Sequence, residues 1–296
     1  MDLLASLLTY QNLITIVTAS TPLLLAATGE LVVERSGVLN LGVEGMMVMG
    51  AVVGFGAAFL TGNPYIGACA AIIAGMMMAL LFAFLTLTLV TNQVATGLAL
   101  TLLGLGLSGL IGEAFVGQPG VKLPGIMGVD ALIVLSFVLT AAVTWFLFRT
   151  RAGLTLRAVG DNHSSAHALG FRVIAVRYLA VLFGGACAGL AGGYLSLAYT
   201  PQWVENMTAG RGWIALALVV FASWRPWRIV GGAYLFGAIS ILSYAVQTFS
   251  LGIPSQFLSM LPYVVTVIAL VVISGNRLLM RANTPACLGQ PFVPDR

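Results

Sequence analysis

Long uninterrupted apolar segments are the feature of this sequence that most restricts its fold. They lie at about 11–29, 38–61, 65–90, 94–112, 130–148, 178–200, 212–224, 229–248 and 258–274. A helix of roughly 20 apolar residues is long enough to cross the hydrocarbon core of a bilayer. The sequence therefore predicts an all-α, polytopic transmembrane helix bundle of about nine spans. Eight to ten spans fit equally well, because sequence patterns place helix ends only to within a few residues.

The composition excludes the other classes of protein. Hydrophobic residues make up 59% of the 296-residue chain and charged residues only 7%, whereas soluble domains carry about 25% charged residues. Intrinsic disorder requires the opposite balance of low hydrophobicity and high charge. A transmembrane β-barrel would show alternating segments of about 10 residues in place of continuous runs. A helical membrane protein remains.

The distribution of arginine predicts the orientation. Twelve of the thirteen basic residues are Arg; five lie between Arg149 and Arg177, and three in the tail 275–296. Positively charged connections of membrane proteins stay in the cytoplasm, so we expect both segments there and the N-terminus outside. This distribution accounts for the net charge of +4, and we expect no nucleic-acid partner.

Two segments interrupt the apolar pattern. Charged and amide residues with several glycines lie between Glu30 and Gly50, and a similar stretch around 205–212 precedes a short seventh run. Gly42-Val43-Glu44-Gly45-Met46 and Gly210-Arg211-Gly212-Trp213 are faintly alike, which indicates two pseudo-symmetric halves with interrupted helices. Such segments mark the substrate path of transporters.

Short sequence matches to enzyme and metal-site motifs occur, but the surrounding sequence lacks the elements that such sites require. Gly104–Gly109 matches G-x-G-x-x-G, but it lies within an apolar run without the strand that a dinucleotide site requires. Like Gly50…Gly54 and Gly185…Gly189…Gly193, it is better explained as close helix packing. His163 and His167 have no third ligand nearby, and neither a P-loop nor a catalytic constellation occurs. We expect no enzyme activity, metal or cofactor in this chain.

The residue pattern of the basic segment 150–177 predicts a short capped helix. Asp161 or Asn162 is suited to begin it and Gly170 to end it, so about two turns fit between them. Ala166 and Leu169, three residues apart, would give this helix a small apolar face. A helix of this kind in the largest cytoplasmic loop is a docking element for another protein; the alternative is a basic loop that only fixes topology.

Several motifs together resemble the permeases of ABC importers of the branched-chain amino acid and simple-sugar superfamily. They are Leu156–Gly160 with Asn162, Ala166 and Gly170, the first-half segment Glu34–Met47, Asn92–Val94 with Gly97–Leu100, Thr208–Gly212, and Pro285–Pro291. The first-half segment is similar to the subgroup that works with Bmp-type binding proteins and imports nucleosides and simple sugars. His163 and Ser165 depart from the usual Pro and Ala.

The resemblance implies a single transmembrane permease domain over 1–296, in a bacterial inner membrane, that translocates a nucleoside or related sugar-containing solute. It implies three partners: an ATPase subunit that binds ATP and Mg²⁺, a second permease, expected to be a paralogue, and an extracytoplasmic Bmp-type binding protein. In this arrangement the ATPase contacts the coupling loop 150–177. The residues concerned are Arg157, Gly160, Asp161, Asn162, Ala166, Leu169 and Gly170.

Polar residues near the interruptions are the candidates for the substrate path. Asn40 and Glu44 would share one helical face by their four-residue spacing, and Asn92 and Thr96 form a similar pair. The set is Asn40, Glu44, Asn92, Gln93, Thr96, Asn206, Thr208 and Arg211. Polar side chains within apolar spans usually face a bundle interior or a wet cavity.

Two alternatives to the path hypothesis remain open. Glu44 could pair with Arg35 or Arg211 and only hold helices together. Alternatively, the chain could be a self-sufficient secondary transporter that uses Glu44 and Glu30 as ion-coupling carboxylates.

Overall fold

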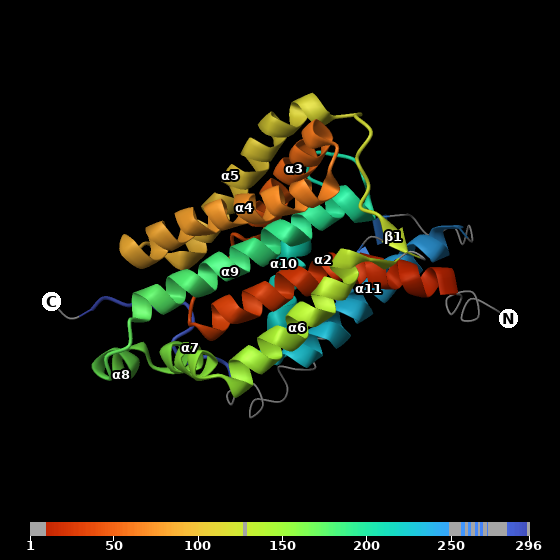
Figure 1. Ribbon diagram of the computed structural model, residues 1–296. Helices are drawn as coiled ribbons and strands as arrows, with labels where there is room; N and C mark the ends of the chain where they lie inside the picture. The colour runs from red at the N-terminus through yellow and green to blue at the C-terminus, as the bar shows by residue number, and fades with distance from the viewer. Residues whose placement is uncertain are drawn as a thin grey trace.

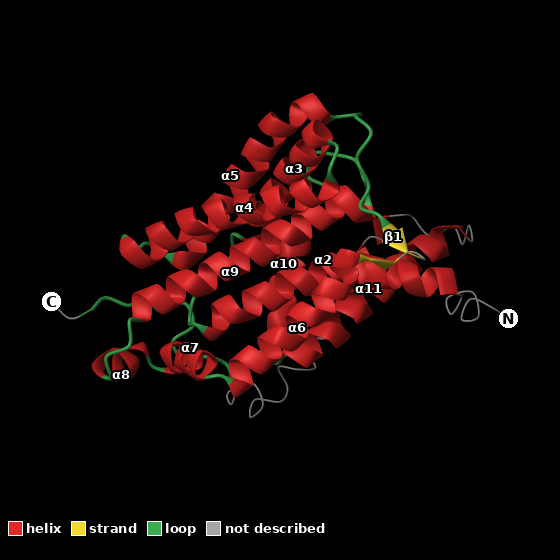
Figure 2. Ribbon diagram, in the orientation of Figure 1, coloured by secondary structure: helices red, strands yellow, loops and turns green. Residues whose placement is uncertain are grey.

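The protein is a bundle of helices, described here from a computed structural model (Figure 1; Figure 2). The structure describes residues 10–126, 129–248 and 283–294, with isolated residues between 256 and 271. The long helices are α2 (Tyr10–Arg35), α3 (Val43–Thr61), α4 (Pro64–Ala83), α5 (Gln93–Gly112), α6 (Ala131–Arg149), α9 (Val173–Tyr194) and α11 (Pro226–Thr248). Shorter helices are α7 (Arg151–Asp161), α8 (His163–Ala168) and α10 (Arg211–Phe221).

Irregular turns extend three of the long helices. π-helical turns follow α4 at Phe84–Thr88 and α9 at Leu195–Tyr199, and a 3-10 turn follows α5 at Glu113–Phe115. The strands among the described residues are the two-residue pair β1 (Gly125–Ile126) and β2 (Val129–Asp130), which are antiparallel. The predicted all-α, polytopic architecture is thus confirmed apart from this small hairpin.

The number of spans is confirmed only in part. Among the described residues, six helices are long and apolar enough to cross a membrane: α2, α3, α4, α5, α6 and α9. The seventh predicted run is α10, whose 11 residues extend only roughly 17 Å. The eighth run coincides with α11, and the ninth, at 258–274, lies outside the continuously described residues. Nine full spans are therefore not established.

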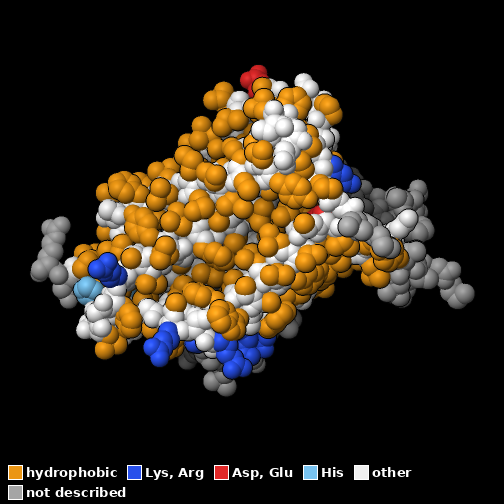
Figure 3. Space-filling model, viewed as in Figure 1, with side chains coloured by type: hydrophobic (Ala, Val, Ile, Leu, Met, Phe, Trp, Pro, Cys, Tyr) orange, Lys and Arg blue, Asp and Glu red, His pale blue; other side chains and the backbone are white. Residues whose placement is uncertain are grey.

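The helices run side by side between two ends of the bundle (Figure 1). In this view α3, α4 and α5 form the upper part, α9 lies across the middle, and α2, α6 and α11 form the lower part. The short helices α7 and α8 lie at the same end as the described tail 283–294, and α2 begins at the opposite end. Apolar side chains cover the face in Figure 3, with basic side chains at its edges, as expected of a multi-pass membrane protein.

Glycines bring α3, α4 and α9 into backbone contact. A Cβ atom added to Gly50 would lie 2.2 Å from the Gly189 carbonyl oxygen, and one added to Gly75 would lie 2.1 Å from that of Gly185. Helices in lipid gain stability from such close approach, because there is no hydrophobic force between them. The packing interpretation of Gly50 and of the Gly185–Gly193 series is confirmed.

We expect Gly189→Ala to destabilise the bundle by about 1–3 kcal/mol, because the added methyl group overpacks a tight contact. Its Cβ would lie 2.2 Å from the Ala71 carbonyl oxygen. Gly106→Ala is the matched control, since a Cβ there meets nothing within 4 Å. Thermal unfolding of the purified protein in detergent measures the difference. Equal melting temperatures for the two variants would contradict the packing argument.

Candidate substrate path and coupling site

Two helix N-termini meet inside the bundle. Gly42 precedes α3 and Gly210, with a left-handed φ of 83°, precedes α10; neither supplies a side-chain cap. A Cβ atom on Gly212 would lie 2.6 Å from the Cα atom of Glu44, so the two helix starts touch. The two glycine-containing segments that look alike in the sequence therefore lie against each other. We call the region of Glu44 and Thr208–Gly212 the junction.

The junction lies inside the bundle. A Cβ atom on Gly45 would lie 2.7 Å from the Leu100 carbonyl oxygen, and Leu100 is in the second turn of α5, which begins at Gln93. This places the start of α3 roughly 10 Å along α5. Since α10 begins at the same level, Thr200–Gly210 must enter the bundle to reach it.

The Glu44 carboxylate connects the two helices. Its Oε1 accepts hydrogen bonds from the Thr208 hydroxyl (2.6 Å) and the Gly210 N–H (2.8 Å), and its Oε2 accepts one from the Gly212 N–H (2.6 Å). The side chain is 3% exposed. A carboxylate at this place satisfies N–H groups that begin α10 and complements the positive end of the helix dipole.

The predicted ion pairs of Glu44 are not formed. Arg35 donates its hydrogen bonds to the carbonyl oxygens of Trp224 and Asn283. Arg211 donates to the Met207 carbonyl oxygen, and its guanidinium lies 5.4 Å from the centre of the Tyr199 ring. The alternative that paired Glu44 with either arginine is wrong, because backbone N–H groups and one hydroxyl already occupy the carboxylate.

Asn40 is buried, but it does not share a helical face with Glu44. Because α3 begins at Val43, Asn40 lies in the preceding loop, and the expectation from four-residue spacing is wrong. Its Oδ1 accepts a hydrogen bond from the Gly42 N–H (2.9 Å). The amide thus fixes the turn that starts α3.

Side chains of α5 hold the loop 36–42 in place. The Gln93 Oε1 accepts a hydrogen bond from the Leu39 N–H (2.8 Å), and the Thr101 hydroxyl donates to the Leu41 carbonyl oxygen (3.1 Å). Gln93 is 4% exposed, and its Nε2 has no hydrogen-bond partner among the described residues.

Asn92 and Thr96 lie at the start of α5 and form hydrogen bonds with residues close to them in the chain. Asn92 is exposed and caps the helix by accepting a hydrogen bond from the Ala95 N–H (3.0 Å). The Thr96 hydroxyl forms a 2.9 Å hydrogen bond with that of Thr91. Neither residue forms a hydrogen bond with Asn40 or Glu44, whose partners are other residues.

Three residues in or beside the junction are accessible. Asn206 is exposed, Arg211 is half-buried, and Trp213 is 50% exposed, whereas Thr208 is fully buried. Trp213 was not among the sequence candidates. Its position directly after the Gly-Arg-Gly that starts a short helix is the signal that could have identified it.

The other end of α10 is attached to the end of α2. The Trp224 Nε1–H donates to the Glu34 carboxylate (2.6 Å), and the Trp224 carbonyl oxygen accepts from Arg35 (2.8 Å). Both ends of the α10 segment are thus bound by residues of the stretch 34–44. Trp224 was missed at the sequence level because its partners lie far away in the chain.

The coupling segment has the predicted local structure. Asn162 caps α8 by accepting a hydrogen bond from the Ser165 N–H (2.9 Å), and Gly170, after the helix, has a left-handed φ of 87°. Asp161 ends α7 and is exposed, and the Arg157 guanidinium lies 5.1 Å from the centre of the Phe148 ring. The capping prediction is confirmed.

The predicted apolar face of α8 is wrong in one of its two residues. Ala166 is 3% exposed and packs with Val159 and Val173 inside the protein. Leu169, in contrast, is 77% exposed, and Phe171 is 40% exposed. The accessible large apolar residues directly after α8 are therefore Leu169 and Phe171.

The C-terminal tail connects the coupling helices to the rest of the bundle. The Cys287 N–H donates to the Gly160 carbonyl oxygen (2.9 Å), and the Gly289 N–H donates to that of Gly37 (3.1 Å). Gly160 itself contacts α2, since a Cβ there would lie 2.2 Å from the Arg35 carbonyl oxygen. The sequence contains no local signal for this arrangement.

The two histidines are part of the tail contact. Their rings lie 5.2 Å and 5.3 Å from the Phe292 ring, and His163 Nδ1 is 3.3 Å from an Arg177 nitrogen. Burial and the Arg177 charge lower the pKa of His163. Among the described residues no group of three His, Cys, Asp or Glu side chains could hold a metal ion.

The family follows from a comparison of the whole chain. Residues 12–272 match the model of the permease component of the branched-chain amino acid transport system. The chain belongs to this family. It is therefore a transmembrane permease subunit of the ABC transporter type, as the sequence motifs indicated. No solved structure matches the chain.

Curated relatives cover most of this permease. It is 40% identical over 80% of its length to a putative glucose ABC transporter permease of Haloferax volcanii, of which 78% is matched. It is 31% identical over 93% of its length to a guanosine ABC transporter permease of Bacillus subtilis (94% matched). It is 29% identical over 89% of its length to a nucleoside ABC transporter permease of Lactococcus lactis (92% matched).

We expect Glu44→Gln to destabilise this permease by about 1–3 kcal/mol, because the amide NH₂ cannot accept the hydrogen bonds that one carboxylate oxygen now receives. Glu113→Gln is the matched control, since Glu113 is exposed at the end of α5. Thermal unfolding in detergent is the measurement. A Glu44→Gln protein as stable as wild type, with reduced transport, would show that the carboxylate acts on the solute instead.

Proposed function

We propose that this permease imports a nucleoside or a related sugar-containing solute, driven by ATP hydrolysis in a partner ATPase. The relatives named for guanosine, nucleosides and glucose support this substrate class. The residues exposed beside the junction suit it chemically. An indole can stack on a base or a sugar ring, while amide and guanidinium groups can bind hydroxyls and ring nitrogens.

The proposed path passes the accessible side of the junction. Asn206, Arg211 and Trp213 contact the solute there, and the buried Asn40, Glu44 and Thr208 hold the wall in shape. Asn92, Gln93 and Thr96 line the arginine-rich end of the path. A second permease, a paralogue of this chain, forms the opposite wall, since the candidate contacts lie on the outside of a single chain.

The observation that carries the coupling proposal is the attachment of α10 at both ends. Its start is bound to Glu44 and its end to Glu34 and Arg35, while Arg35 contacts Gly160 of α7. A displacement of the coupling helices by the ATPase therefore reaches the path through the stretch 34–44 and α10. Coupling of this kind requires contacts that differ between two states.

The proposed complex contains three kinds of partner. The ATPase binds ATP and Mg²⁺ and docks at the end of α8 through Leu169 and Phe171, which follow this helix. A Bmp-type binding protein delivers the solute to the connections 116–130 and 200–210 at the other end of the bundle. The membrane is the bacterial inner membrane, and this chain needs no cofactor of its own.

Uptake by the complete importer in vesicles tests the function directly. We expect accumulation of labelled guanosine that depends on ATP and is reduced by an excess of unlabelled nucleoside. Leu169→Asp should abolish uptake and stimulated ATP hydrolysis, because it places a charge in an apolar contact. Leu154→Asp is the matched control, since Leu154 is equally apolar and 59% exposed, on α7.

Two results would contradict this proposal. Wild-type uptake by the Leu169→Asp importer would show that the ATPase docks elsewhere. Uptake by this permease alone, driven by an ion gradient without ATP, would favour a secondary transporter.

The proposed orientation can be tested by cysteine labelling in intact cells. With the three native cysteines replaced, a cysteine at Gln118 should react with an impermeant thiol reagent, whereas cysteines at Ser164 and Gln290 should not. All three positions are exposed in the structure. The result therefore depends on the side of the membrane on which each cysteine lies, and not on its burial. Labelling of Ser164 from outside would reverse the orientation.

A further inference from the structure

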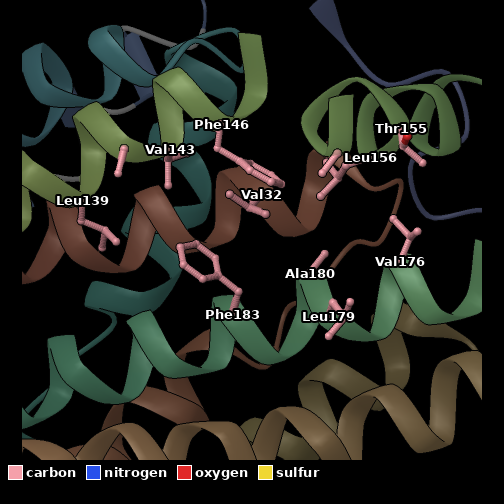
Figure 4. Close-up of a pocket in the computed structure, with 12 residues that line it drawn as sticks. Val32, Leu139, Val143, Phe146, Thr155, Leu156, Val176, Leu179, Ala180 and Phe183 are labelled. Carbon is pink, nitrogen blue, oxygen red and sulfur yellow. The ribbon is translucent and has the colours of Figure 1, made fainter. Parts of the chain in front are cut away.

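An apolar groove opens on the face of the bundle formed by α2, α6, α7 and α9. Its volume is about 500 Å³, and its lining includes Val32, Leu139, Phe146, Leu156, Val176 and Phe183. Figure 4 shows these side chains directed from four helices toward one space. The volume lies within the range of small-ligand sites, roughly 300–1,000 Å³. Neither the junction nor the ATPase-docking residues Leu169 and Phe171 belong to it.

Arginines continue the groove toward the end of the bundle where α7 lies. Arg149 follows the lining residue Phe146 by three positions on α6, Arg172 precedes Val176 by four, and Arg151 precedes Thr155 by four. Residues three or four apart lie on one face of a helix, so Arg149 of α6 and Arg151 of α7 are one turn beyond the groove. Arg172 is the residue directly before α9, one turn ahead of the first lining residue of that helix. All three are exposed, and none forms an ion pair within the described part of the chain.

Aromatic side chains mark the level of the membrane interface beside these arginines. Trp145 is 64% exposed and Phe148 44% exposed at the end of α6, and tryptophan is enriched where the bilayer meets water. We therefore expect the arginines to lie at headgroup height and the apolar groove to extend from this level into the hydrocarbon layer. Figure 3 shows basic side chains at the corresponding edge of the face.

We infer that the groove binds an anionic phospholipid. One acyl chain occupies the apolar groove, and Arg149, Arg151 and Arg172 bind the phosphate-containing headgroup. Basic pockets between transmembrane helices bind anionic headgroups in this manner, and arginine matches phosphate geometry through paired hydrogen bonds. Because Leu156 and Thr155 of α7 line the groove, the lipid contacts a coupling helix as well as α6 and α9. The leaflet follows from the proposed orientation, but the binding does not depend on the transport function.

Native mass spectrometry of the full-length permease tests this inference. The protein is equilibrated in mixed micelles with equimolar phosphatidylglycerol and phosphatidylethanolamine. We expect wild type to retain phosphatidylglycerol preferentially. In the variant Arg149→Gln, Arg151→Gln, Arg172→Gln the preference should fall by about fivefold for each arginine removed. The double variant Arg225→Gln, Arg228→Gln is the control. These exposed arginines lie directly before α11 and in its first turn, on a helix that does not line the groove.

A second pair of variants tests the acyl-chain part of the site. Ala142→Phe narrows the groove from α6 and should reduce the retention of both lipids, whereas Ala141→Phe, on an exposed neighbour outside the lining, should not. An unchanged headgroup preference in the triple variant would overturn the inference. So would a loss of assembly with the second permease in Ala142→Phe without any change in lipid retention, because the groove would then be a protein interface.

Discussion

The interior of this permease depends on one carboxylate. Two helices, α3 and α10, begin against each other inside the bundle, and each helix start carries unpaired N–H groups and a partial positive charge. At this depth there is no bulk water to satisfy such groups, and each one left unpaired costs several kcal/mol. Glu44 lies in the first turn of α3 and accepts hydrogen bonds from Thr208, Gly210 and Gly212. Its negative charge offsets the repulsion between the two positive helix starts and allows α10 to begin part-way through the bundle.

The short length of α10 has a mechanical consequence. A helix that crosses the whole membrane has loops at both ends that can absorb motion, whereas α10 is fixed at its start by Glu44 and at its end by Glu34 and Arg35. Its two anchor points belong to one stretch of the chain. The backbones of Gly160 and Arg35 are in direct contact, so α7 is closely packed against the start of this stretch. The coupling helices, the stretch 34–44 and α10 are thus suited to move as one unit.

Local patterns predicted those features whose causes are local. Continuous apolar runs predicted the spans, 13 apolar residues before Trp224 predicted a short seventh element, and Asn162 and Gly170 predicted the limits of α8. The prediction that Asn40 and Glu44 share a helical face was wrong because α3 begins at Val43, three residues after Asn40. A shift of this size is within the normal error of helix boundaries.

Features that depend on distant partners could not be read from the sequence. The inward orientation of Ala166 is set by a cluster to which the tail residue Phe292 belongs, and a two-turn helix has no pattern that reveals which side will be covered. The hydrogen bonds of Trp224 with α2 and the tail contact at Gly160 are equally non-local. Glu44 stood out as a charge in an apolar run, but its partners are mainly backbone N–H groups, which every residue type except proline supplies.

The hydrogen bonds of Glu44 also bear on how energy enters the transport cycle. A carboxylate that binds a proton or a sodium ion during transport must exchange its partners in every cycle. An ion bound at Glu44 would have to compete with the N–H groups of Gly210 and Gly212 for the carboxylate oxygens, so ion binding there would oppose the attachment of α10. The other carboxylate of the ion-coupled hypothesis, Glu30, is 1% exposed within α2. A Glu44 whose two oxygens already accept hydrogen bonds fits a permease whose conformational change is imposed from outside, through the coupling helices, better than one that generates the change at Glu44.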